Sequence, residues 1–280
     1  MDQLAVIGHL DKIATIVRRG GLQRLTRLGR NVVKTLLREG VSARFEDIFI
    51  SAPIELRGFL SRVQAGRFEP FMSRLYKESV TMNSTVLDIG ACFGYYTLLA
   101  AKAGAKVYAF EPDLEVFHYL TANIQKNNFA EAVVAISKAV SNKAGTMSFF
   151  VHEDDRSQNS LFDDAGHGRI VRQIETLSLD EFLPEGLPVD VIKMDIEGAE
   201  LQALAGMEKT LSHPCKTTLF IECNPVSLRL GGSSPGALLR RLENFGFRVW
   251  IIDEQEGRLF PAVGQLEALK KYVNLYCVQS

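Results

Sequence analysis

A chain of 280 residues, with 46% hydrophobic and 23% charged residues, has the composition of a globular protein with one large domain or a domain plus an extension. Its net charge of −1 gives no general attraction to nucleic acid, and no apolar run reaches the roughly 18 residues of a membrane span. Four scattered cysteines without a C-x-x-C pair argue against a disulfide framework or a zinc site. Since the start also lacks a secretory signal pattern, we predict a cytoplasmic protein without stable membrane insertion.

The first 80 residues form a segment with a helical pattern. Apolar residues recur at helical spacing on either side of Gly20-Gly21, and residues 52–79 also show a mostly helical pattern. The basic residues of the first half are Arg18, Arg19, Arg24, Arg27, Arg30, Lys34 and Arg38. We predict a helical N-terminal extension over residues 1–80 that docks as a lid or forms a homo-oligomer. An acidic partner or a membrane surface is the alternative.

Residues 81–280 alternate between short apolar runs and amphipathic stretches, which predicts one α/β domain. Strands are predicted over residues 85–88, 106–110, 132–137, 189–194, 217–223, 247–252 and 272–278. Helices are predicted over residues 95–103, 114–127, 199–211 and 235–245. Alternation of this kind implies a mostly parallel sheet with right-handed crossovers. The last two strands have no clear helix between them and suit an antiparallel hairpin at one edge of the sheet.

An insert over residues 145–177 breaks the alternation. It begins like a strand over residues 146–151 and becomes polar over residues 152–169, where we expect it to line the pocket of an acceptor substrate. His167, between two glycines, is a candidate general base, although a lone loop histidine is more commonly just solvated. The five histidines show no metal-ligand spacing.

The turn after the first predicted strand of the domain has a cofactor-loop pattern. Asp88 is followed by Gly90, Ala91 and Gly94, while Cys92 stands where a dinucleotide fingerprint requires its second glycine. The form D-x-G-x-x-x-G instead fits S-adenosylmethionine (SAM), which has no pyrophosphate. Asp88 lies at a strand end and could accept a hydrogen bond from the ammonium of SAM. The alternative is a tight strand–helix turn that binds no ligand.

The next strand ends in a carboxylate. Glu111 could accept hydrogen bonds from both ribose hydroxyls of a nucleoside, whereas alone it would be a solvated strand-end residue. Pro112 stops the strand after it. Together the candidate cofactor-binding residues are Asp88, Gly90, Ala91, Gly94, Tyr95, Glu111 and Pro112.

A second acidic loop follows the predicted strand 189–194. Asp195 and Glu197 are the candidate catalytic residues, while Glu200 in the first helical turn is explained by the helix dipole. Lys193 could be a general base only if burial lowered its pKa, and pairing with a neighbouring carboxylate is the favoured alternative.

A metal site is a weaker alternative at the same edge of the sheet. Asp195, Glu222 and Asn224 offer three hard oxygen ligands from adjacent strand ends, as Mg²⁺ prefers. We favour no metal, with Glu222 as a hydrogen-bonded residue near a turn.

In their order and spacing, six segments resemble the FkbM family of SAM-dependent methyltransferases. They are FEP at 68–70, LDIGAxxGYYT at 87–97, AFEP at 109–112, AVSNKAG at 139–145, TLSLD at 176–180 and IKMDIEGAE at 192–200. The resemblance covers residues 68–223. It implies a class I methyltransferase (Rossmann-like) fold with a seven-stranded sheet, SAM as cofactor, and methyl transfer to hydroxyls of sugars, polyketides or other secondary metabolites. Cys92 departs from the family pattern, where such loops often have Asn.

SAM carries its methyl group on a sulfonium, so the protein must align acceptor oxygen, methyl carbon and sulfur and exclude water. An aliphatic hydroxyl is a poor acid, and our hypothesis is that Asp195 or Glu197 accepts its proton or orients it.

Two other functions remain as alternatives. The missing G-x-G-x-x-G counts against a nucleotide-dependent oxidoreductase, and the complete loop at 88–94 with Glu111 counts against a non-catalytic protein with this fold.

Overall fold

The structure is a computed structural model that describes residues 40–152, 160–162, 169–213 and 215–279. The apolar and basic residues predicted to form helices over residues 1–39 lie outside the described residues. So do His167 and most of the polar insert that was expected to line an acceptor pocket.

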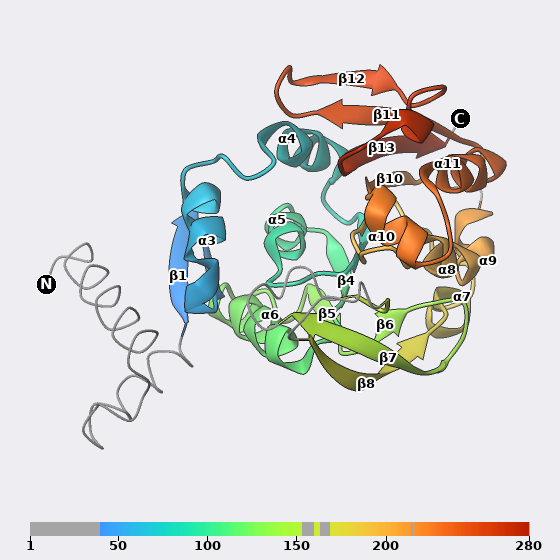
Figure 1. Cartoon of the computed structure of the whole chain (residues 1–280). Coiled ribbons are helices and arrows are strands. Elements are labelled where there is room, and N and C mark those ends of the chain that lie inside the picture. The colour runs from blue at the N-terminus through green and yellow to red at the C-terminus, as the bar shows by residue number, and fades with distance from the viewer. Residues whose placement is uncertain (1–39, 153–159, 163–168, 214, 280) are drawn as a thin grey trace, which may run out of the picture.

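The central sheet has eight strands (Figure 1). In spatial order they are β12 (Arg258–Pro261), β11 (Phe247–Asp253), β13 (Val273–Gln279), β10 (Thr218–Cys223), β9 (Val191–Met194), β3 (Thr85–Ile89), β4 (Lys106–Phe110) and β5 (Val133–Ile136). The five strands from β10 to β5 run parallel, and β13 is antiparallel to both neighbours. The predicted mostly parallel α/β fold is therefore confirmed.

The sheet has one strand more than the seven expected. β12 follows the turn after β11 and pairs with it antiparallel. Its four residues are exposed or half-buried, so it lacks the buried apolar run that marked the other seven strands. The expected antiparallel edge is present, because β11 pairs with β13.

The helices flank the sheet, and several begin at the caps that the sequence provides. They are α5 (Tyr95–Lys102), α6 (Leu114–Lys126), α7 (Leu179–Phe182), α8 (Glu200–Ala205), α9 (Glu208–Leu211), α10 (Pro225–Leu230) and α11 (Pro235–Asn244). Asp113, Asn224 and Ser234 cap α6, α10 and α11 with their side-chain oxygens. Helix α10 was not predicted.

The single helix predicted over residues 199–211 is wrong, because α8 and α9 are separate. The carbonyl of Gly206 accepts hydrogen bonds from the Asp180 N–H at 2.9 Å and the Ser178 hydroxyl at 3.0 Å. A Cβ at Gly206 would lie 2.0 Å from the Ser141 carbonyl oxygen. The helix therefore ends where its backbone is pressed against the segment before β7.

The segment before the domain is only partly helical. It contains β1 (Val41–Phe45), β2 (Ile48–Ala52), a 3₁₀ turn (Ile54–Leu56), α3 (Arg57–Gln64) and α4 (Pro70–Ser79). The expectation of helix throughout residues 1–80 is thus wrong for residues 41–52, which form a hairpin. Glu46 and Asp47 both have positive φ, 45° and 66°, as a two-residue hairpin turn of type I′ requires.

The hairpin docks on α6 beside α5, in blue in Figure 1. Asn123 of α6 bonds both backbone groups of Ser51, at 2.8 and 2.9 Å, and Asn127 does the same for Phe49, at 2.8 and 2.7 Å. Phe45, Ile48 and Ile50 belong to the same buried cluster as residues of α5 and α6. The described part of the N-terminal segment therefore shares its core with the domain.

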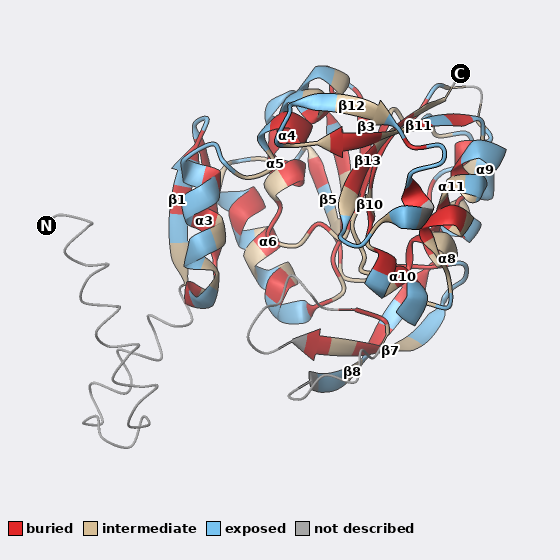
Figure 2. Cartoon of the chain, turned by 45° about the horizontal axis from the view of Figure 1, so that its top comes forward, coloured by how far each residue is buried: buried red, intermediate tan, exposed pale blue. Residues whose placement is uncertain are grey.

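A core lies on each face of the central sheet, whose strands are mostly buried in Figure 2. One cluster packs α4, α5, α6 and the hairpin against one face, and the other packs α8, α9 and α11 against the opposite face. A smaller three-stranded sheet of β6 (Ala139–Val140), β8 (Arg169–Leu177) and β7 (Gly145–His152) stands beside them. β7 confirms the strand-like start of the insert, and β8 was not predicted.

Candidate functional site

A cavity of about 290 Å³ opens at the carboxyl ends of β3, β4 and β9. This is where open parallel sheets bind ligands. All candidate cofactor-binding and catalytic residues line it except Gly94. Glu222 and Asn224 do not line it. Residues of α3 and of the segment that leads into α4 complete the wall, among them Phe59, Arg62 and Glu69.

The loop after β3 has a backbone that requires glycine at two positions. Gly90 has φ of 79°, and a Cβ there would lie 2.0 Å from the carbonyl oxygen of Asp195. Gly94 has φ of 91° and precedes the first residue of α5. Cys92 also has positive φ, 50°. Asn tolerates this left-handed region better than most residues, so the Asn that the family resemblance leads us to expect here would fit the same backbone.

Asp88 is held beneath this loop. Its side chain is buried, and its Oδ2 accepts a hydrogen bond of 2.5 Å from the Thr97 hydroxyl in the first turn of α5. Burial raises the pKa of the Asp88 carboxyl, although the Thr97 hydrogen bond and the Lys193 charge oppose this shift. Asp88 therefore ties the start of α5 to the end of β3, and its contact with a ligand stays a prediction.

Glu111 forms the cavity wall at the end of β4. Its Oε2 accepts from the Cys92 N–H at 3.0 Å, and its Oε1 accepts from the Asp113 N–H at 2.8 Å. Burial raises the pKa of the Glu111 carboxyl to about 8, even though both backbone N–H groups favour the ionised form. The carboxylate is thus fixed in direction, and a ligand that donates hydrogen bonds to it would favour its ionised form.

Lys193 on β9 provides the positive charge of the opposite wall. Its Nζ lies 3.2 Å from Asp195 Oδ2 and 5.4 Å from the centre of the Tyr96 ring. Burial alone would lower its pKa, but Asp195, Glu69, Asp88 and Glu222 together raise it. Lys193 therefore stays protonated and pairs with a carboxylate, as favoured above, and does not fit the general-base alternative.

Glu69 was quoted only as part of a family motif and not as a site residue. Its Oε2 accepts a hydrogen bond of 2.6 Å from the Tyr96 hydroxyl, and its Oε1 accepts one of 2.8 Å from Asn274 Nδ2 on β13. Burial raises the pKa of the Glu69 carboxyl. The only local signal was an acid directly before a proline at a helix start, which is more often an ordinary cap.

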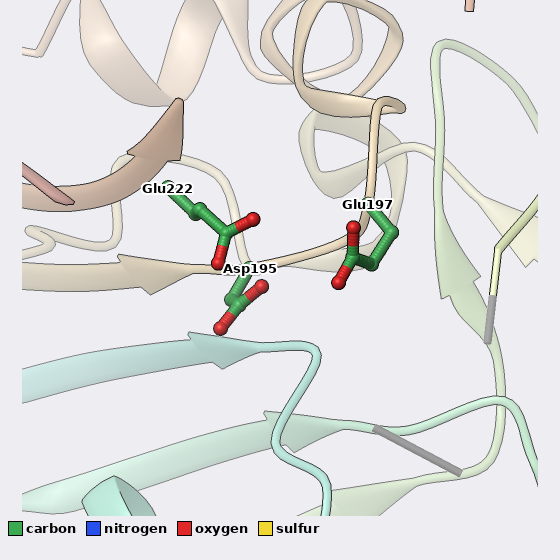
Figure 3. A group of neighbouring side chains, drawn as sticks. All are labelled: Asp195, Glu197 and Glu222. Atoms are coloured by element: carbon green, nitrogen blue, oxygen red, sulfur yellow. The ribbon is translucent and has the colours of Figure 1, made fainter. Parts of the chain in front are cut away.

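Three carboxylates lie together at the carboxyl ends of β9 and β10 (Figure 3). Oxygens of Asp195, Glu197 and Glu222 lie within 4.8 Å of one another and point toward a common centre. Burial, followed by the charges of Asp195 and Glu197, raises the pKa of Glu222 to about 10. Asn224 was predicted as the third ligand of the alternative metal site with Asp195 and Glu222. Its side-chain oxygen instead accepts from the Val226 and Ser227 N–H groups as the cap of α10. The third carboxylate beside Asp195 and Glu222 is Glu197.

Part of the strained backbone in the described ranges lies at this cavity. Glu69, Cys92 and Glu197 are non-glycine residues with φ of 41°, 50° and 49°, and all three line it. Such conformations cost on the order of 1–3 kcal/mol each and persist where surrounding contacts hold them. Ser227 Oγ holds Glu197 through a hydrogen bond of 2.8 Å to its Oε2.

These features suit a ligand that carries vicinal hydroxyls near β4 and a cation near β9. The glycine turn allows close backbone approach, Glu111 presents two fixed acceptors, and acids outnumber Lys193 at the other side. SAM has both groups. The fold and the site thus define a class I methyltransferase.

A family model described as the methyltransferase FkbM domain matches residues 88–249, which is more than half of the chain. The chain therefore belongs to the FkbM methyltransferase family, and its cofactor is SAM. This membership favours the methyltransferase over the oxidoreductase alternative.

Two curated relatives are similar to this chain. Methyltransferase sdnD of Sordaria araneosa is 28% identical over 159 residues, covering 45% of this chain and 61% of the relative. Hexuronic acid methyltransferase AglP of Haloferax volcanii is 29% identical over 152 residues, covering 54% of this chain and 61% of the relative. The chain thus spans about three fifths of the length of these relatives.

Among solved structures, a SAM-dependent methyltransferase from Aquifex aeolicus is 18% identical to this chain. The match has a TM-score of 0.44 and covers 77% of this chain and 93% of the other. Within the described ranges, no helix combines the length and the apolar character needed to cross a membrane.

Proposed function

We propose that this protein transfers the methyl group of SAM to a hydroxyl oxygen of a small molecule, such as a sugar, polyketide or other secondary metabolite. The observation that carries the proposal is the half-exposed Asp195 carboxylate, which lies in the same cavity as the cofactor loop and is held by Lys193 at 3.2 Å. One relative is named a hexuronic acid methyltransferase, which supports an acceptor of sugar type.

Bound SAM supplies a methyl group already activated on sulfonium. Glu111 binds the ribose hydroxyls, and the turn at Gly90, packed against the Asp195 backbone, forms the floor of the cofactor site. The apolar rings of α3 and the β3 loop, such as Phe59 and Phe93, exclude water.

Asp195 or Glu197 accepts the acceptor hydroxyl's proton or orients that hydroxyl. Both carboxylates are fixed, Asp195 by Lys193 and Glu197 by Ser227. We propose no metal, because Lys193 already balances part of the acidic charge next to Asp195. The homo-oligomer and the cytoplasmic location stay predictions, since the N-terminal helices on which the oligomer depends lie outside the described residues.

The first experiment is incubation with methyl-labelled SAM and host extract, followed by identification of the labelled product. An ether-linked methyl group on a small molecule is expected, whereas label on nitrogen or on protein would contradict the proposal. With that acceptor, Asp195→Asn should lower turnover and keep S-adenosylhomocysteine (SAH) affinity, while the exposed-site control Glu185→Gln should change neither. Unchanged turnover in Asp195→Asn would remove Asp195 from the assignment.

A further inference from the structure

Glu69 lies outside the residues that the family model matches, yet it lines the cofactor cavity. It precedes α4 as its N-cap residue, the position from which a side-chain oxygen can bond the first free N–H groups of the helix. Here the Glu69 side chain makes no such bond. Its carboxylate is available for another role.

Another residue caps α4 in its place. Glu254, in the turn between β11 and β12, accepts from the Phe71 N–H through Oε2 and from the Met72 N–H through Oε1, both at 2.9 Å. This bidentate contact satisfies the helix start and holds it against the sheet. Glu69 is thereby released from capping, and its backbone takes a left-handed φ of 41°.

The released carboxylate is held in one direction. Tyr96 and Asn274 each donate one neutral hydrogen bond, to different oxygens of Glu69. Each carboxylate oxygen can accept a second bond, so the group still has acceptor capacity toward the cavity. Tyr96 and Asn274 come from α5 and β13, two elements far apart in the sequence, and together they preorganise an anionic acceptor.

The acidic groups around Glu69 favour binding of a cation. Glu69, Asp88 and Asp195 all interact with the single ammonium of Lys193. Among these three acids, Asp88 is already committed to Thr97 beneath the loop. Acidic side chains therefore outnumber the ammonium of Lys193 on the β9 side of the cavity, where Arg62 of α3 is a further cation on the wall. Glu111, the ribose candidate, lies across β3 on the β4 side.

We infer that Glu69, in place of the Asp88 predicted from the sequence, binds the α-ammonium of the methionine part of SAM. The inference rests on the proposed function, since it assumes a SAM cavity with the ribose at Glu111. An extended cofactor with its ribose at the end of β4 crosses the end of β3 and brings its amino acid part to the side of Lys193 and Glu69. An ammonium has three donors and satisfies the free acceptor positions there.

The test compares two ligands by calorimetry. SAH carries the α-ammonium, and 5′-methylthioadenosine has the same nucleoside without the amino acid. Glu69→Gln should weaken SAH binding by about tenfold to a hundredfold, as for loss of a charge-assisted hydrogen bond. It should leave methylthioadenosine binding within about twofold. Glu69→Asp keeps the charge and should lose less SAH affinity than Glu69→Gln, and the exposed control Glu185→Gln should bind both ligands like the wild type.

Each outcome decides between the ideas. If Glu69→Gln lost the same affinity for both ligands, Glu69 would merely support the fold. If its SAH affinity were unchanged, Glu69 would not contact the cofactor. Either result would overturn this inference and leave the proposed function standing. A wild-type protein that binds neither ligand would overturn the proposed function as well. Retained methylthioadenosine binding shows that a variant has kept its cavity folded.

Discussion

The binding of SAH should depend on pH through Glu111. Its pKa in the ligand-free protein is about 8, because burial outweighs the two backbone N–H groups that favour the ionised form. Ribose hydroxyls donate hydrogen bonds to a carboxylate, so the ligand binds the ionised form and a proton competes with it below pH 8. The association constant should therefore fall as the pH falls.

The magnitude follows from the distance to that pKa. At pH 6, two units below about 8, the association constant should be about one hundredth of its value at pH 9, a loss of about 2.7 kcal/mol. Calorimetry with SAH from pH 6 to pH 9 measures it. In Glu111→Gln the dependence should be much shallower, because other buried carboxyls such as Glu69 still titrate. Its absolute affinity is lower, because one amide oxygen cannot accept from both Cys92 and Asp113.

A wild-type affinity that is constant over this range would refute the reasoning, as would a slope in Glu111→Gln as steep as that of the wild type. The same group gives a second readout in the ligand-free protein. A carboxyl whose pKa is higher folded than unfolded contributes stability that is complete below pH 4.5 and is lost as the pH rises to about 8. The wild-type melting temperature should therefore fall relative to Glu111→Gln across that window.

Three further changes test the scaffold of the site. Gly90→Ala should reduce SAH affinity more than a hundredfold, because its Cβ would meet the Asp195 carbonyl oxygen at 2.0 Å; Gly66→Ala, with a similar φ but open space, should not. Lys193→Met should lower the free energy of urea unfolding by about 3–5 kcal/mol, since it leaves buried carboxylates without their cation; a loss below 1 kcal/mol would contradict that role. Asn123→Ala should cost about 1–3 kcal/mol in the same assay, because it leaves buried backbone groups of the hairpin unpaired, and no change would show that water replaces it.

The sequence was sufficient for elements whose signal is local. The seven predicted strands are apolar runs that become buried, and their observed ends differ from the predicted ones by at most two residues, as at β9 (Val191–Met194). The hairpin was misread as helix, although residues 41–52 alternate between buried and exposed positions around Glu46-Asp47. There a period of two was present but the turn lacked glycine, the usual marker of its type.

The residues of the site also divide into those with a local sequence signal and those without one. Asp88, Glu111 and Asp195 were found because carboxylates at the ends of parallel strands converge at one edge of the sheet. Glu69 was not predicted as a site residue, because its side chain is left out of helix capping only where Glu254 caps α4 in its place. Glu254 comes from the other end of the chain. No spacing within a single element records a contact of that kind.

The pairing of α6 with the hairpin has a consequence for assembly. A two-stranded ribbon normally exposes a row of amide groups onto which another chain can add a strand. Along β2 (Ile48–Ala52), Asn123 and Asn127 already bind the outward amide and carbonyl groups of Phe49 and Ser51. Side-chain amides thus stand in for a neighbouring strand, and the β2 edge (Ile48–Ala52) is closed to strand addition by a second copy.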